Sequence, residues 1–312
     1  MIHSFRSWFY GIAIILIAFI FYASTDSNEE KVGDVAITES PNLDGKGLPQ
    51  IIKPILLDKT YSVAGEPLPA DNFDVMERLD REFLVNSYWH SSTLLNLKAA
   101  KRYFPIMEQV LAREDVPEDF KYVAVIESNL RNVTSPAGAK GLWQFMPSVA
   151  RGYGLELSRE VDERYHLEKS TRAACALIKD YKKRFNTWTN AMGAYNMGET
   201  RFAKEQSIQK MDSYYDMNFG AETGRYLFRI LAVKEIMEQP QDFGFYLEDL
   251  DPLYKPLTDC NMVKVDKTIA NLGEFAKEHG TTYRMLKVYN PWLISSRLTV
   301  APGKTYEIKI PI

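Results

Sequence analysis

The sequence predicts a mainly α-helical protein with a small α+β module at its C-terminal end. Apolar residues recur at helical spacing through the middle of the chain, whereas strand-like alternation is confined to the region after Met262. A chain of 312 residues, of which 46% are hydrophobic, can bury a sizeable core and leaves room for one larger domain and one smaller module. The net charge of −3 provides no broad positive field, which argues against nucleic acid as a partner.

The N-terminal segment has the composition of an export signal. His3 and Arg6 precede an unbroken apolar run over residues 8–23, and a polar stretch follows over residues 24–31. No small-residue cleavage site follows the run and no cysteine near it can accept a lipid, so we favour an uncleaved signal anchor over a cleaved signal peptide within residues 1–30. Residues 31–94 are predicted to be a tether and helical lead-in, rich in Pro, Gly, Asp and Ser as far as residue 72 and helical over residues 73–88.

A short helix near the middle of the chain carries an acidic residue on an apolar stripe. Pro117 suits a first helical turn, and the pattern continues towards residue 129. Phe120, Val123, Ala124 and Glu127 fall on one face. Because burial favours the neutral form of a carboxyl group, we expect a raised pKa at Glu127, as a general acid requires. A structural ion pair with arginine is the alternative role of a buried glutamate.

Further helices are predicted on both sides of this segment. The periodic stretches cover residues 95–111, 170–185, 187–195 and 223–238, with Ser170 as the expected N-cap of the second and Pro240 beyond the end of the last. Near the C-terminus, Val263 and Val265 predict a short strand, residues 272–279 and 283–289 two helices, and residues 306–310 a final strand.

The cysteines and histidines show no metal-ligand spacing. Cys175 lies within a helical pattern and is expected to be a small buried hydrophobe, while the four histidines are scattered along the chain. We therefore expect no metal site and no cofactor.

Three separated motifs carry a family resemblance. They read VIES at residues 125–128, SPAGAKGLWQFMP at 135–147 and AYNMG at 194–198. In this order they resemble the soluble lytic transglycosylase (SLT) domain of glycoside hydrolase family 23, and the VDERY segment at 161–165 fits its membrane-bound transglycosylase D branch. The resemblance implies a lysozyme-like, all-helical catalytic domain, which we place at residues 95–245.

The resemblance also implies a reaction. Glu127 occupies the place of the family's catalytic glutamate, which protonates the glycosidic oxygen between MurNAc and GlcNAc and then removes the proton of the MurNAc C6 hydroxyl. The product is a 1,6-anhydro-MurNAc end, and one carboxylate suffices because the internal hydroxyl replaces water. The positions implied to bind substrate are Ser135, Gln144, Tyr195, Asn196 and Tyr226. For Tyr226, a purely structural role in the core is the alternative.

The C-terminal segment, residues 258–312, resembles a divergent LysM module, a βααβ glycan-binding repeat. The resemblance rests on Gly280, on Asn290 with Pro291, and on the ending IKIP at 308–311. The usual Gly-Asp-Thr opening turn is absent, since residues 265–268 read VDKT. Glycan binding by this module is therefore left open.

These inferences lead to an expected function and two alternatives. The expected protein is an extracytoplasmic lytic transglycosylase that acts on peptidoglycan glycan strands and is held to the membrane by its N-terminal segment. One alternative is a goose-type lysozyme-like hydrolase, in which Asp162 or Glu163 orients a water molecule. The other is a non-catalytic peptidoglycan-binding scaffold that grips glycan without cleaving it.

Overall fold

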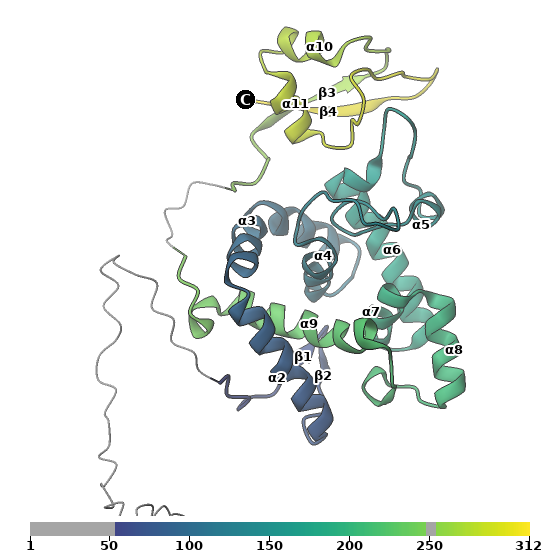
Figure 1. Cartoon of the computed structure of the whole chain (residues 1–312). Helices are drawn as coiled ribbons and strands as arrows, with labels where there is room; N and C mark the ends of the chain where they lie inside the picture. Colours follow the sequence, from purple (N-terminus) through teal and green to yellow (C-terminus); the bar gives the residue numbers. More distant parts are fainter. Residues whose placement is uncertain (1–53, 248–253) are drawn as a thin grey trace, which may run out of the picture. The chain divides into compact units, whose positions relative to one another are not determined.

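The computed structural model describes residues 54–247 and 254–312 (Figure 1). The predicted signal anchor at residues 1–30 and the first part of the predicted tether lie outside these residues. Within the described ranges, no helix combines the length and the apolar composition that crossing a membrane requires. The helices predominate, as expected, and the strands are short.

A short hairpin precedes the helices and was not predicted. Strands β1 (Ser62–Val63) and β2 (Glu66–Pro67) pair antiparallel around Gly65, whose φ of 74° suits the tight turn. Val63 is fully buried in the helical core. The Glu66 carboxylate accepts hydrogen bonds from the backbone amides of Trp188 (2.6 Å) and Thr189 (2.9 Å), the first residues of the later helix α7 (Trp188–Met197). This part of the lead-in is therefore anchored in the domain.

Three helices build the frame around the centre of the domain. Helix α2 (Phe73–Tyr88) has the predicted bounds, whereas α3 (His90–Arg113) begins earlier and ends later than predicted. Helix α2 packs along α9 (Ala221–Glu238). Between them, the fully buried carboxylate of Glu82 accepts hydrogen bonds from the Arg225 guanidinium at 2.6 and 3.0 Å.

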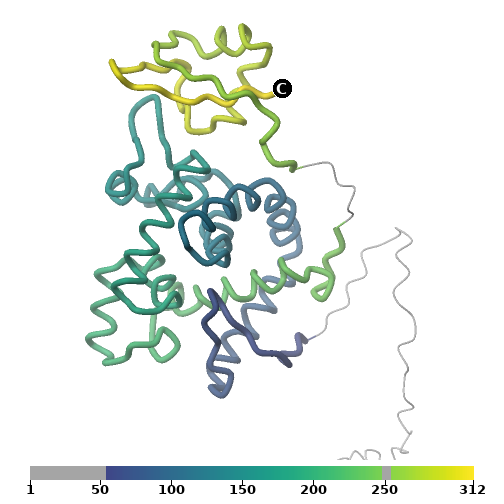
Figure 2. The backbone as a smooth tube through the Cα atoms, turned by 180° about the vertical axis from the view of Figure 1, so that it is seen from behind, coloured from purple at the N-terminus to yellow at the C-terminus, as the bar shows by residue number. Residues whose placement is uncertain are grey.

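Helix α4 (Lys121–Ser128) follows the 3-10 turn η1 (Glu118–Phe120), close to the predicted position. It ends at Asn129, which adopts the left-handed conformation with φ of 50°. Helix α4 contacts both α3 and α9, and the views in Figures 1 and 2 place it among the surrounding helices. Val123, Ala124 and Val125 are buried there. The predicted apolar helix is thus confirmed as a central element.

The remaining elements of the helical domain are α5 (Pro147–Gly152), η2 (Glu163–Tyr165), α6 (Leu167–Phe185), α7, α8 (Glu199–Gln209), η3 (Tyr214–Asp216) and η4 (Pro240–Phe243). The prediction that Ser170 caps α6 was wrong. The helix begins at Leu167, and the buried Ser170 hydroxyl donates to the Leu167 carbonyl at 3.3 Å. Thr187 caps α7 by accepting a hydrogen bond from the Asn190 amide, and the predicted burial of Cys175 is confirmed.

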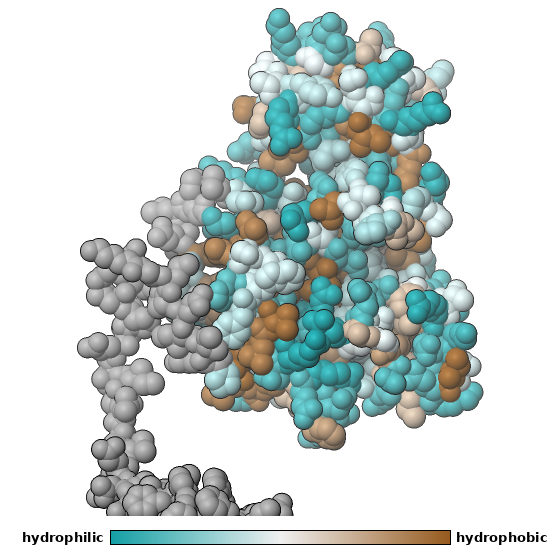
Figure 3. All heavy atoms as spheres, viewed as in Figure 1, coloured by the Kyte–Doolittle hydropathy of each residue, from teal (hydrophilic) through white to brown (hydrophobic). Residues whose placement is uncertain are grey.

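The C-terminal module has the predicted βααβ order. Strand β3 (Cys260–Val265) pairs antiparallel with β4 (Tyr306–Pro311), and α10 (Leu272–Glu278) and α11 (Tyr283–Tyr289) lie between them in the chain. Figure 2 shows the two strands side by side. Leu272, Leu286 and Ile308 are fully buried in a core separate from that of the helical domain. In Figure 3, apolar side chains on the visible face are interspersed with hydrophilic ones.

Candidate active site

Glu127 lies in the last turn of α4 and contacts a tyrosine from α9. The Tyr226 hydroxyl donates a hydrogen bond to Oε1 of Glu127 at 2.6 Å. Tyr226 is buried, with 1% of its surface exposed, whereas Glu127 is partly exposed. Packing of α9 against α4 brings the two residues together. Among the residues that the structure describes, the carboxyl group is therefore held by Tyr226 and is still partly exposed.

The surroundings of Glu127 set its protonation. Burial raises the pKa of Glu127 to about 7, against the opposing effects of the Tyr226 hydrogen bond and the positive charge of Arg229, while the charge of Glu222 adds to the rise. The raised pKa predicted from the buried stripe is confirmed. A carboxyl group with this pKa is present in both protonation states at neutral pH, so it can act first as an acid and then as a base.

Tyr195, on α7, lies beside this pair but directs its hydroxyl elsewhere. The hydroxyl donates to the backbone carbonyl of Trp143 at 2.7 Å. Burial raises the pKa of Tyr195 well above its ordinary value, and the nearby charge of Glu127 adds to the effect. The fully buried Trp143 ring donates from Nε1 to the Thr171 hydroxyl at 3.0 Å. Tyr195 therefore ties α7 to the loop that carries Trp143.

That loop, residues 133–146, is here called the glycan loop because it carries two predicted substrate-binding residues. Gln144 has a φ of 47°, and its Nε2 donates to the carbonyls of Val133 (3.2 Å) and Gly141 (2.8 Å). Ser135 accepts a hydrogen bond from the Ala139 amide at 3.0 Å. Both side chains are partly exposed. The Oε1 atom of Gln144 and the hydroxyl proton of Ser135 take no part in these bonds.

Asn196 stabilises the start of α9. Its Oδ1 accepts a hydrogen bond from the Thr223 hydroxyl at 2.7 Å, one turn before Tyr226. The structure thus places Tyr226 in contact with Glu127 and Tyr195 beside both, whereas the bonds of Asn196 are to α9.

Two further residues support the site. The buried Ser128 hydroxyl donates to the carbonyls of Ala124 (3.0 Å) and Leu142 (2.9 Å), which joins the glycan loop to α4 directly after Glu127. A supporting role for Ser128 agrees with its place next to the glutamate in the sequence. Arg229 was missed, although it lies three residues after Tyr226 and therefore on the same side of α9.

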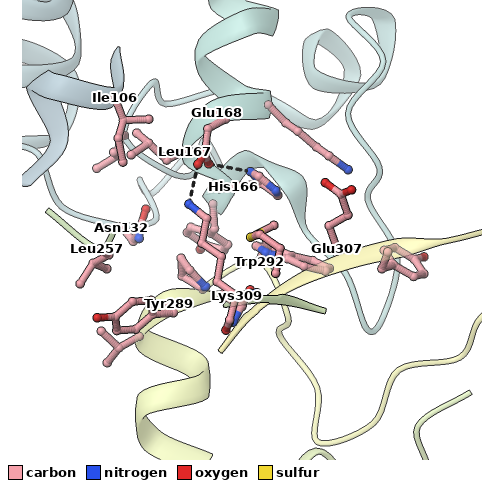
Figure 4. A pocket seen from close by; sticks show the side chains of 18 of the residues that line it. Ile106, Asn132, His166, Leu167, Glu168, Leu257, Tyr289, Trp292, Glu307 and Lys309 are labelled. Carbon is pink, nitrogen blue, oxygen red and sulfur yellow. Dashed lines mark hydrogen bonds and ion pairs between the residues drawn. The ribbon is translucent and has the colours of Figure 1, made fainter. Parts of the chain in front are cut away.

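A cavity of about 610 Å³ lies between the helical domain and the C-terminal module (Figure 4). Glu168 projects into it and contacts Lys309 of the module at 2.5 Å and Nδ1 of His166 at 3.3 Å. Burial opposes ionisation of Glu168, but the hydrogen bonds from His166 and Lys309 outweigh it and lower the pKa of Glu168 to about 2. Glu127 does not line this cavity. In the described parts of the chain, no group of three or more His, Cys, Asp or Glu residues is placed to hold a metal ion.

Comparisons with known proteins agree with this arrangement. Residues 104–218 match the transglycosylase SLT domain, and residues 261–312 match the soluble lytic transglycosylase C-terminal LysM-like domain. The membrane-bound lytic murein transglycosylase D of two Escherichia coli strains is 29% identical over 245 residues, which are 76% of this chain and 51% of the relative. The chain thus spans about half the length of these relatives.

A solved structure is also similar. It is an inactive mutant of the lytic transglycosylase Slt from Pseudomonas aeruginosa, 18% identical, with a TM-score of 0.35 over 45% of this chain and 24% of that one. From the two family matches, the chain contains a transglycosylase SLT domain followed by a soluble lytic transglycosylase C-terminal LysM-like domain.

Proposed function

We propose that this protein is a lytic transglycosylase that cleaves the MurNAc–GlcNAc β-1,4 bond of peptidoglycan and leaves 1,6-anhydro-MurNAc ends. The observation that carries the proposal is Glu127: a partly exposed carboxyl group with a pKa of about 7, held by Tyr226, inside a matched SLT domain. The 29% identity to a murein transglycosylase supports the substrate class.

The proposed reaction needs one carboxyl group in two states. Protonated Glu127 gives its proton to the glycosidic oxygen as the bond from MurNAc C1 to that oxygen breaks. The resulting carboxylate takes the proton of the C6 hydroxyl as O6 forms a bond to C1, so Glu127 ends protonated and no water is consumed. Tyr226 donates to the carboxylate between the two steps, when the charge is greatest. Gln144 and Ser135 supply neutral hydrogen bonds to the sugar.

The hydrolase alternative needs a group that activates water. Asp162 and Glu163, the two predicted candidates, are buried and already paired. Asp162 is bound by the Arg164 guanidinium at 2.9 and 2.7 Å, and Glu163 by Lys169 at 2.5 Å. Neither carboxylate is free to orient a water molecule. Mass spectrometry of digested peptidoglycan tests this point: the proposal expects anhydro ends, and reducing ends that have gained water would establish hydrolysis instead.

The scaffold alternative is tested by Glu127→Gln, which keeps the shape of the side chain and removes its acidity. We expect turnover to fall by about 10² to 10⁴-fold while binding to sedimented peptidoglycan is retained. Glu199→Gln is the matched control, because Glu199 is a partly exposed residue at the start of α8 that forms an ion pair with Arg184. A wild-type protein that binds peptidoglycan and never cleaves it would make the scaffold the correct function.

We also propose an extracytoplasmic location with a membrane anchor. The support is the apolar run at residues 8–23 and the murein substrate, together with the membrane-bound relative. Cell fractionation of the full chain, beside a chain in which the apolar run carries two lysines, tests the anchor. Recovery of the full chain in the soluble fraction would contradict it.

A further inference from the structure

A hairpin of the helical domain is docked on the C-terminal module. This docking hairpin, residues 156–163, lies between α5 and α6 and reaches the β3–β4 module in Figures 1 and 2. The Asp162 amide donates to the Trp292 carbonyl at 2.9 Å, and the Ile294 amide donates to the Glu160 carbonyl at 3.0 Å. Val161, with 1% of its surface exposed, belongs to the hydrophobic core of the module. The module is thus completed by a residue of the helical domain.

Charged contacts reinforce this docking. Carboxylates of the helical domain face cations of the module. The pairs are Glu156–Lys304 at 2.6 Å, Glu160–Arg297 at 3.1 Å and Glu168–Lys309 at 2.5 Å. Beside the last pair, the Trp292 ring stacks on His166 with 5.6 Å between ring centres (Figure 4). Trp292 therefore meets the helical domain through both its ring and its carbonyl.

The other side of the hairpin is bonded to the glycan loop. Asp162 holds the Arg164 guanidinium, and Nη1 of Arg164 donates to the carbonyls of Gly138 and Phe145, at 3.1 Å each. Asp162 and Arg164 are 3% and 4% exposed. Because both groups are buried, a geometry that separates them would deprive the Arg164 guanidinium of its carboxylate partner, which is costly. The loop also packs on the backbone here: a Cβ atom at Gly141 would lie 2.0 Å from the Arg164 carbonyl oxygen.

We propose that the C-terminal module is a positioning element for the catalytic site, and that Arg164 is the positioning residue through which it acts. By holding the docking hairpin, the module fixes Asp162 and hence the Arg164 guanidinium. Arg164 in turn fixes the glycan loop, which presents Gln144 and supplies the Trp143 carbonyl bound by Tyr195. The mechanical part of this proposal stands on the contacts alone, and its catalytic consequence rests on the proposed function.

Val161→Asp is the substitution that we expect to separate the docking hairpin from the C-terminal module. The apolar core of the module does not tolerate a buried carboxylate at position 161. The same position becomes solvent-exposed when the docking hairpin leaves the module, so the helical domain can stay folded. A milder second variant combines Glu156→Gln with Glu160→Gln, which removes two charged contacts. Ile208→Asp is the control, because Ile208 is 62% exposed on α8.

Hydrogen exchange measured by mass spectrometry gives a readout that needs no substrate. In Val161→Asp we expect amides of residues 133–146 to exchange about tenfold faster, with those of α9 unchanged. The double variant should move in the same direction by less, and the control should match the wild type. Protection of residues 133–146 that persists in both docking variants overturns the proposal.

Kinetics on peptidoglycan strands then test the catalytic consequence. Undocking of the hairpin should raise KM by about 3- to 30-fold. The pH at which activity falls on the alkaline side should stay near the pKa of Glu127, about 7, because Glu127 and Tyr226 are not displaced. The increase should be smaller in a Gln144→Ala background, since the loop has then already lost its ligand group. Faster loop exchange with an unchanged KM would refute the catalytic part. A wild type that cleaves no glycan would refute the proposed function and leave the exchange result standing.

Discussion

Tyr226→Phe removes the hydroxyl that donates to Glu127 and leaves the buried ring in place. A hydrogen bond donated to a carboxylate favours the charged form and lowers its pKa. Its loss should therefore raise the pKa of Glu127 above the present value of about 7. A hydrogen bond to a charged group contributes about 1.5–3 kcal/mol, and each pKa unit corresponds to about 1.4 kcal/mol, so the expected rise is about one to two units.

The assay is kcat/KM on peptidoglycan strands as a function of pH. The proposed acid step requires protonated Glu127, so activity of the wild type should fall as pH rises through about 7. In Tyr226→Phe this descending limb should move to about pH 8–9. Activity at lower pH should also decrease, because the carboxylate formed between the two steps has lost a donor.

A matched control makes the interpretation specific. Tyr153→Phe also deletes a tyrosine hydroxyl that contacts a carboxylate, Asp180, at 2.8 Å, but this ring is partly exposed and Glu127 takes no part in the pair. Its descending limb should stay at the wild-type pH. A descending limb of Tyr226→Phe that stays near pH 7, or that moves to lower pH, would refute the conclusion that this hydrogen bond lowers the pKa of Glu127.

Two further predictions concern stability, each measured by urea unfolding. Gly141→Ala should lower the free energy of unfolding by about 2 kcal/mol or more, because a φ of 80° disfavours alanine and the added methyl group would clash with the Arg164 carbonyl. Gly138→Ala is the control: its φ is 87°, but the space around it is open, so the loss should be smaller. Equal losses in the two variants would contradict the clash. Arg225→Ala should lower the free energy of unfolding by about 3–5 kcal/mol, because it deprives the fully buried Glu82 carboxylate of its main partner. A loss below about 1 kcal/mol would show that the ion pair with Arg81 is sufficient for that carboxylate.

The sequence was most informative where one face of an element is continuously apolar. Helices α2 and α11 have the bounds that periodicity predicted, and the central helix α4 was placed with its buried stripe. Helix α8 was missed because Phe202 is its one buried residue, so it has no apolar stripe to detect. The cap at Ser170 was misassigned because a preference for serine at helix starts is weaker than the tertiary packing that extends α6 back to Leu167.

Some features of the candidate site could be predicted from the sequence and others could not. The direction of the pKa shift of Glu127 could be predicted from the sequence, because the apolar stripe of its own helix indicated that the carboxyl group is buried. The bond from Tyr226 joins residues 99 positions apart, and a single sequence gives no signal for such a pair without the family motif. The bonds of Arg164 to the loop carbonyls were not foreseen either, because backbone acceptors have no residue type that marks them.

The two opposing influences on Glu127 fit the proposed mechanism, in which a single carboxyl group performs both proton transfers. Burial alone would raise the pKa further and give a group that rarely ionises, which is a good acid and an ineffective base for the C6 hydroxyl. Tyr226 and Arg229 alone would lower it and leave a carboxylate with no proton to donate to the glycosidic oxygen. Their balance at a pKa of about 7 populates both the protonated and the ionised form of Glu127 at neutral pH. The position of α9 against α4 sets that balance, because α9 supplies both the hydroxyl and the guanidinium.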